Sequence, residues 1–150
     1  METDAITALK QRQREMWKSF APTAMFTTPV AAHLVRFADV KSGESVLDVG
    51  TGTGVVAITA AHAGARVCGI DLTPALLEEA ERNARLAGVD VAWTEGDAEK
   101  LPYPDASFDV VLSQFGHMFA PRPEVVVAEM RRAHASGTYT SGSVPACPAP

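Results

Sequence analysis

The sequence predicts an α/β fold class with a doubly wound, mostly parallel sheet. Between residues 45 and 133, short apolar runs typical of buried strands alternate with segments of helical periodicity. Strands separated by helices of this length form parallel βαβ units, with helices on both faces of the sheet. We expect the strand order 3-2-1-4, with the topological switch point, and a ligand site, beside strand one.

Composition and charge restrict the class of protein. The chain has 150 residues, 47% hydrophobic and 21% charged, which fits one soluble domain. A net charge of −5 disfavours nucleic-acid binding through bulk charge, and no apolar stretch is long enough to span a membrane. Because Glu2 and Asp4 are acidic and no apolar segment follows them, we expect no secretory signal. Cys68 and Cys147 lie in unrelated settings that disfavour a disulfide or a metal site, and this favours a reducing, cytoplasmic location.

Four strands are predicted from short apolar or alternating runs. The first ends at glycines, and in the third Val89, Val91 and Trp93 alternate with other residues. The predicted strands are residues 45–49, 66–70, 89–93 and 108–112.

Five helices are predicted around these strands. An amphipathic helix over residues 4–20 covers the domain, and we expect its four basic residues on a solvated face. Pro29 suits the first turn of the second helix, whereas Thr73, Pro74 and Gly88 delimit the fourth. The remaining predicted helices are residues 29–40, 55–63, 74–87 and 124–133.

Charge distribution divides the chain. All charged residues lie within residues 1–133, whereas the last segment is rich in Pro, Ser, Ala and Thr. A segment of that composition has no pattern for a packed element. We therefore expect an N-terminal helical segment over residues 1–28, a ligand-binding domain over residues 29–133 and an unstructured tail over residues 134–150.

A glycine-rich turn joins the first strand to the next helix. The segment reads Val46-Leu47-Asp48-Val49-Gly50-Thr51-Gly52-Thr53-Gly54. Glycines permit positive φ and close approach of a ligand, and the following helix presents unpaired N–H groups. In the dinucleotide fingerprint Gly-x-Gly-x-x-Gly/Ala the third glycine comes one residue later, where this chain has Val55. The turn therefore indicates a bound ligand and disfavours a dinucleotide.

Two acids lie at the ends of neighbouring predicted strands. Asp48, two residues before Gly50, would repel a pyrophosphate but suits an ammonium or sulfonium group. Asp71 lies 21 residues after Gly50, where an acid that accepts two ribose hydroxyls is expected. As alternatives, Asp48 caps amides of the glycine turn and Asp71 starts the turn at Leu72. Their joint placement favours a nucleoside with a cationic arm and no diphosphate.

Four segments resemble a known family. They are Asp48-Val-Gly50-Thr-Gly52-Thr-Gly54, Gly69-Ile-Asp71, Glu95-Gly96-Asp97-Ala98-Glu99 and Leu101-Pro102-Tyr103-Pro104-Asp105-Ala-Ser107-Phe108-Asp109. From about residue 46 to residue 133, the chain resembles class I S-adenosylmethionine-dependent methyltransferases. It is most similar to the small-molecule branch (methyltransferase type 11) that contains the ubiquinone and menaquinone C-methyltransferases. The resemblance implies a Rossmann-like fold, S-adenosyl-L-methionine as cofactor and methyl transfer to a small-molecule acceptor.

The resemblance also implies roles for individual residues. Asp48 and the glycine turn would hold the methionine part, Asp71 the ribose hydroxyls and Leu72 the adenine. Asp97 would accept from the adenine amine and the Ala98 N–H would donate to a ring nitrogen.

Ser113 and Gln114, at the end of the fourth predicted strand, would lie beside the sulfur of the cofactor. As alternatives, Asp97 is only a turn former and Ser113 only a strand terminator. The residues expected to bind the cofactor are Asp48, Gly50, Thr51, Gly52, Thr53, Gly54, Asp71, Leu72, Asp97, Ala98, Ser113 and Gln114.

The catalytic residues are not identified, and no metal site is indicated. Methyl transfer from a sulfonium mainly requires alignment, so a base is needed only where the acceptor loses a proton. His117 is the candidate base, with an inert loop histidine as its alternative. Phe115, Met118 and Phe119 are candidates for an acceptor pocket, with core packing as their alternative. Trp17 and Phe20 are candidates for a lid over the site.

The chain departs from the family pattern after Arg132. Where the resemblance predicts a Pro-Gly-Gly turn and a fifth strand, the sequence continues Ala133-His134-Ala135-Ser136-Gly137. We therefore expect a chain truncated after about residue 133, with the C-terminal strands missing. Residues 110–112 would then form an apolar edge through which the protein self-associates. The alternative functions are a non-catalytic cofactor-binding remnant and, disfavoured by Asp48, an NAD-dependent oxidoreductase.

Overall fold

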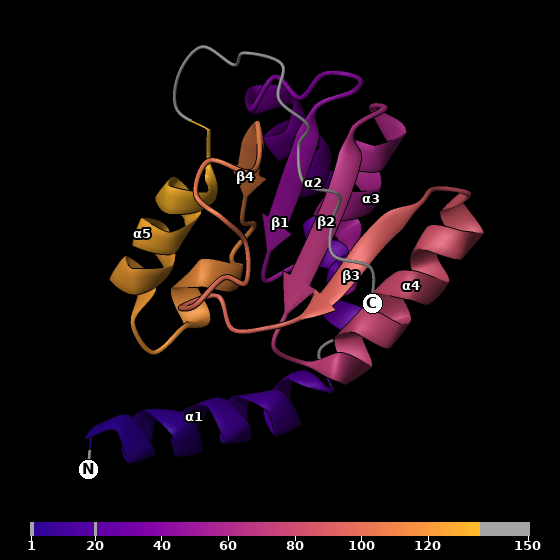
Figure 1. The fold of residues 1–150 in the computed structure, drawn as a ribbon. Helices are drawn as coiled ribbons and strands as arrows, with labels where there is room; N and C mark the ends of the chain where they lie inside the picture. Colours follow the sequence, from indigo (N-terminus) through magenta and orange to yellow (C-terminus); the bar gives the residue numbers. More distant parts are fainter. Residues whose placement is uncertain (1, 20, 136–150) are drawn as a thin grey trace.

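The computed structural model describes residues 2–19 and 21–135 and contains a four-stranded parallel sheet (Figure 1). The strand order is β3-β2-β1-β4, which confirms the predicted order. Ser45 lies opposite Arg66 and Val49 opposite Ile70, so β1 and β2 end at the same edge of the sheet. The strands are β1 (Ser45–Val49), β2 (Arg66–Asp71), β3 (Val91–Glu95) and β4 (Val110–Leu112).

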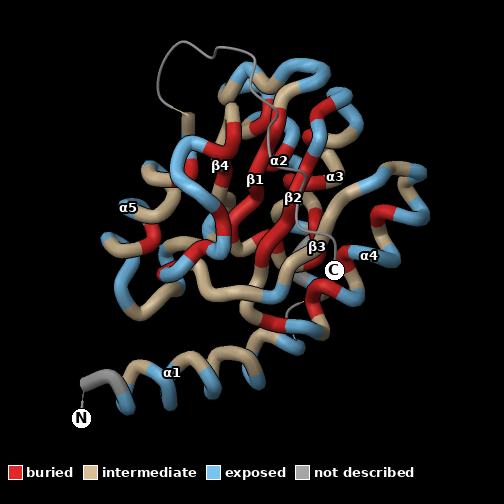
Figure 2. The backbone as a smooth tube through the Cα atoms, in the orientation of Figure 1, coloured by how far each residue is buried: buried red, intermediate tan, exposed pale blue. Residues whose placement is uncertain are grey.

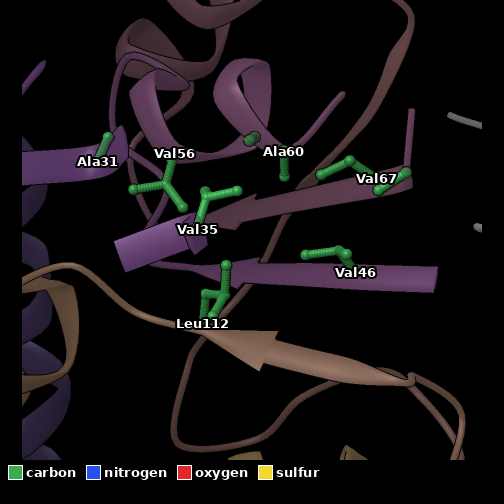
Figure 3. Packing of buried hydrophobic residues seen from close by; sticks show 9 residues of the cluster. Ala31, Val35, Val46, Val56, Ala60, Val67 and Leu112 are labelled. Carbon is green, nitrogen blue, oxygen red and sulfur yellow. The ribbon is translucent and has the colours of Figure 1, made fainter. Parts of the chain in front are cut away.

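Helices cover both faces of the sheet. The helices are α1 (Glu2–Trp17), α2 (Ala24–Phe37), α3 (Val55–His62), α4 (Pro74–Ala87) and α5 (Pro123–Ala133), with the short 3₁₀ helices η1 (Ala21–Thr23) and η2 (Gly116–Phe119). Val46 of β1 packs with Val67 and Leu112 against α2 and α3 (Figure 3). Leu47 and Val49 point to the opposite face, where α5 and the loop over residues 101–108 cover them. The inner strands are therefore buried on both sides (Figure 2).

The second helix starts earlier than predicted. α2 begins at Ala24, so Pro29 lies inside the helix rather than in its first turn. Proline has no N–H and therefore removes one helical hydrogen bond. The 3₁₀ turn η1 leads directly into α2 and extends the helical segment on the N-terminal side of Pro29.

β3 and β4 start two residues later than predicted. The Val89 N–H donates to the Ala84 carbonyl at 3.1 Å, within the helix cap that Gly88 forms at φ 69°, so Val89 belongs to the end of α4. Phe108 forms a bridge with His134 rather than pairing with β1. In both places another backbone contact, within the end of α4 or with His134, replaces the first strand pairing.

Several predictions concern residues outside the described ranges. These are residues 136–150 of the unstructured tail predicted over residues 134–150, Cys147 as a thiol separate from Cys68, and Phe20 as a lid residue. Cys68 itself is buried in β2. Among the described residues, no helix is both long and apolar enough to cross a membrane.

Candidate functional site

A cavity of about 520 Å³ lies at the carboxyl end of the sheet and is lined in part by α1. α1 runs across this end of the sheet (Figure 1). The segments that follow all four strands contribute to the wall of the cavity, as expected for ligand sites in doubly wound sheets. The predicted site residues that line it are Asp48, Gly50, Thr51, Gly52, Thr53, Asp71, Leu72, Asp97, Ala98 and Gln114. Gly54 and Ser113 do not line it.

The glycine turn forms one side of the cavity. Gly50, Gly52 and Gly54 all have positive φ, which side chains rarely adopt. At Gly54 a Cβ would lie 2.8 Å from the Trp93 ring, so this glycine permits packing of α3 against β3 and does not contact the cavity. Its role is therefore structural.

Gly116, from η2, contacts this turn and was not identified from the sequence as a site residue. A Cβ on Gly116 would lie 2.8 Å from the Cα of Gly50 and 2.9 Å from the Val49 carbonyl oxygen. The turn after β1 and η2 after β4 are therefore in backbone-to-backbone contact. The signal in the sequence that could have identified Gly116 is its position soon after the end of the fourth predicted strand.

Asp48 both caps the glycine turn and lines the cavity. It is 1% exposed, and its carboxylate accepts the Thr51 hydroxyl at 2.6 Å and the Ala57 N–H at 3.2 Å. Burial raises the pKa of Asp48 to about 7, against the lowering effect of these hydrogen bonds, and the charge of Asp71 adds to the rise. A cationic group would restore the favourable electrostatics that burial removes.

Asp71 lies at the end of β2 beside the same turn. One carboxylate oxygen accepts the Gly52 N–H at 2.9 Å and the other accepts the Thr73 N–H at 2.8 Å. Burial raises the pKa of Asp71, although these hydrogen bonds oppose the rise. Each carboxylate oxygen can accept a second hydrogen bond, so the group can receive two hydroxyls of a ligand.

Two residues after β4 are held together outside the cavity wall. The Ser113 hydroxyl donates to the Val49 carbonyl at 2.8 Å and accepts the His117 N–H at 3.1 Å, so Ser113 ties β4 to β1. The His117 side chain does not line the cavity, and its buried Nδ1 has no hydrogen-bond partner among the described residues. Gln114 does line the cavity and donates to the Thr27 carbonyl at 2.9 Å.

One face of α1 forms the roof of the cavity. Lys10, Gln13, Arg14 and Trp17 have the i, i+3, i+4, i+7 spacing of neighbours on a helix. Gln13 donates to the Phe119 carbonyl at 2.6 Å, and the ring of Trp17 packs edge-on at 4.7 Å from that of Phe119. The apolar residues Leu9 and Met16 of α1 are 43% and 51% exposed.

The expectation that all four basic residues of the helix predicted over residues 4–20 face solvent is wrong for two of them. Lys10 Nζ lies 2.6 Å from Asp97 and 2.7 Å from Glu99, and Arg14 donates to the Leu72 carbonyl at 2.8 Å. Burial alone would lower the pKa of Lys10, but its hydrogen bonds to the two carboxylates raise it. Carboxylates that follow β3 therefore draw this face of the helix toward the site. Arg12 and Lys18 are exposed, as predicted.

The wall of the cavity nearest η2 is apolar. Trp17, Phe115, Met118 and Phe119 line it, and Phe115 has a φ of +67°, rare for an aromatic residue. The last three remain 45–58% exposed, so they form a surface rather than core packing. Within residues 2–19 and 21–135, no cluster of side chains is suited to a metal ion.

Comparison with known proteins identifies relatives of this fold and site. The family model described as "Methyltransferase domain" matches residues 46–137. An uncharacterized protein of Mycobacterium tuberculosis is 43% identical over 122 residues, which cover 79% of this chain and 44% of the relative. The demethylmenaquinone methyltransferase of Thermus thermophilus is 37% identical over 99 residues, which cover 65% of this chain and 45% of that enzyme.

A solved structure shares the arrangement of the elements. The arsenic(III) S-adenosylmethionine methyltransferase from Chlamydomonas reinhardtii superposes with a TM-score of 0.59 and 33% identity, over 65% of this chain and 37% of that protein. The chain thus spans less than half the length of each of these three proteins.

Proposed function

The chain belongs to the class I S-adenosylmethionine-dependent methyltransferases, and on this premise we propose that its cavity binds S-adenosylmethionine for methyl transfer to a small-molecule acceptor. One observation carries the proposal. Asp48 and Asp71, at the ends of adjacent strands, line the same cavity as the glycine turn. This combination suits a nucleoside that carries a positive charge and lacks phosphates.

The cavity fits such a ligand in size and in chemistry. Its volume of about 520 Å³ lies within the range of about 300–1,000 Å³ that small-molecule sites occupy. Asp71 would hold the ribose hydroxyls, Leu72 and Ala98 would border the base, and Asp97 would accept from its amino group. Asp48 and the glycine turn would hold the amino-acid arm. When bound, the cofactor supplies a methyl group on a positively charged sulfur.

The apolar wall near η2 would receive the acceptor. Trp17, Phe115, Met118 and Phe119 would exclude water and bind an apolar acceptor surface. No histidine lines the cavity among the described residues, and the buried Nδ1 of His117 has no hydrogen-bond partner there. The contribution we propose for the residues of this cavity is alignment of the reactants.

Isothermal titration calorimetry tests the proposal. Saturable binding of S-adenosylhomocysteine, with no heat from NADH, is the expected result. Binding of NADH alone would favour an oxidoreductase and contradict the proposal.

A second assay separates an enzyme from a cofactor-binding protein without activity. Turnover of S-adenosylmethionine with a panel of quinols and phenols identifies the enzyme. Binding without turnover across the panel identifies the non-catalytic alternative.

A further inference from the structure

We propose that Lys10 of α1 is a positioning residue that holds Asp97 in the orientation needed to read the base of the bound nucleoside. The inference rests on the proposed function, because it concerns the base end of the same cavity. By this inference, a residue of α1 contributes to the base specificity of the site, in addition to the residues that follow the strands. Lys10 and Asp97 both line the cavity.

Lys10 is itself held from behind by a buried carboxylate. The Glu99 side chain is 2% exposed and accepts from Lys10 at 2.7 Å and from Arg122 Nη2 at 2.7 Å. The Arg122 N–H donates to the other Glu99 oxygen at 2.8 Å. Burial alone would raise the pKa of Glu99, but the hydrogen bonds from Lys10 and Arg122 lower it. Glu99 therefore fixes the ammonium group of Lys10 beside the base end of the cavity, the part near Leu72, Asp97 and Ala98 that would hold the nucleobase.

The orientation of the Asp97 side chain depends on Lys10 more than that of Glu99, which Arg122 also holds. One Asp97 oxygen accepts the Glu99 N–H at 2.9 Å and the other accepts Lys10 Nζ at 2.6 Å. The Asp97 side chain is 36% exposed, so without Lys10 the oxygen that does not accept the Glu99 N–H is expected to turn toward solvent. A carboxylate has about four acceptor positions, so Asp97 retains capacity for an amino group of the ligand.

Polar contacts dock the helix that carries Lys10. On the same face, Arg14 donates to the Leu72 carbonyl and Gln13 to the Phe119 carbonyl, while Leu9 and Met16 remain exposed. Leu72 and Asp97 follow different strands, so α1 bridges both sides of the base end.

The test compares two ligands that differ only at the base. S-adenosylhomocysteine carries a 6-amino donor, whereas S-inosylhomocysteine carries a 6-oxo acceptor that opposes the Asp97 carboxylate. The wild-type chain is expected to prefer the adenosyl ligand in calorimetric titrations. Lys10→Met should weaken binding of that ligand about three- to tenfold and reduce its preference over the inosyl ligand. Part of the preference should remain, because the Ala98 N–H would still distinguish the ring nitrogens of the two bases.

Matched variants separate positioning from docking. Lys10→Arg should restore part of the preference, and Arg12→Met, on the exposed side of the same helix, should leave both affinities unchanged. In an Asp97→Ala background, Lys10→Met should change affinity by less than about twofold, because its target is gone.

Three results would overturn the inference. Equal losses for both ligands in Lys10→Met would show that Lys10 only docks α1. Unchanged or tighter binding of the adenosyl ligand would show that Lys10 does not support Asp97. Absence of binding to the wild-type chain would remove the proposed function together with this inference.

Discussion

Replacing Asp48 with Asn is expected to stabilise the protein at pH 8. Asp48 is 1% exposed and its pKa is raised from 3.8 to about 7, chiefly by burial. Each pKa unit corresponds to about 1.4 kcal/mol, so holding this carboxylate ionised in the fold costs up to about 4 kcal/mol. Asparagine keeps an oxygen for the Thr51 hydroxyl and the Ala57 N–H but carries no charge.

The direction of the pH effect follows from the raised pKa. The contribution of Asp48 to stability is fully present below about pH 4 and is lost as the pH rises through about 7. The stability gained by Asp48→Asn should therefore reach about 4 kcal/mol at pH 8 and be smaller by roughly 3 kcal/mol at pH 5. Asp71 is coupled to Asp48 through its charge, whereas the remaining titrating groups should affect both proteins similarly, so the difference reports on this pair of carboxylates.

Urea denaturation followed by circular dichroism measures this difference at both pH values. Asp90→Asn is the control, because Asp90 is exposed and the substitution should leave stability unchanged at either pH. A stability difference for Asp48→Asn that is the same at pH 5 and pH 8 would refute the reasoning. So would a variant that is less stable than the wild type at pH 8.

Three further predictions concern the loops and the sheet edge. Gly116→Ala places a Cβ 2.8 Å from the Cα of Gly50, so it should lower the free energy of unfolding by about 1–3 kcal/mol and weaken S-adenosylhomocysteine binding. The control Gly88→Ala, which has open space around it but a positive φ, should lower the free energy of unfolding by about 1–2 kcal/mol and leave the affinity unchanged. Arg132→Met removes hydrogen bonds to two loop carbonyls, and thermal denaturation should show a loss of about 2 kcal/mol; an unchanged melting temperature contradicts this. Among the described strands β4 pairs with β1 alone, so sedimentation should depend on concentration, and a single monomeric boundary at all concentrations contradicts self-association.

The sequence predicted the parts of the site that local patterns determine. The strand ends, the glycine turn and the cavity positions of Asp48 and Asp71 follow from short apolar runs and from where each run ends. Asp48 also performs the alternative role considered for it, because its carboxylate caps the turn while it lines the cavity. A single residue thus satisfies both interpretations.

Contacts between distant segments were not predictable in the same way. Periodicity identified α1 but did not indicate which face of it turns toward the domain. The carboxylates that pair with that face, Glu99 with Lys10 and Glu95 with Arg14, lie more than eighty residues away in the chain. The close approach of Gly116 to Gly50 depends on the pairing of β4 with β1, which sequence spacing does not determine.

Binding of S-adenosylhomocysteine to wild-type and Asp71→Ala protein tests the central claim most directly. Because Asp71 offers both carboxylate oxygens beside the glycine turn, its removal should weaken binding at least about tenfold, as expected for the loss of hydrogen bonds to a charged group. An affinity that Asp71→Ala leaves unchanged would contradict the assignment of this cavity to the nucleoside.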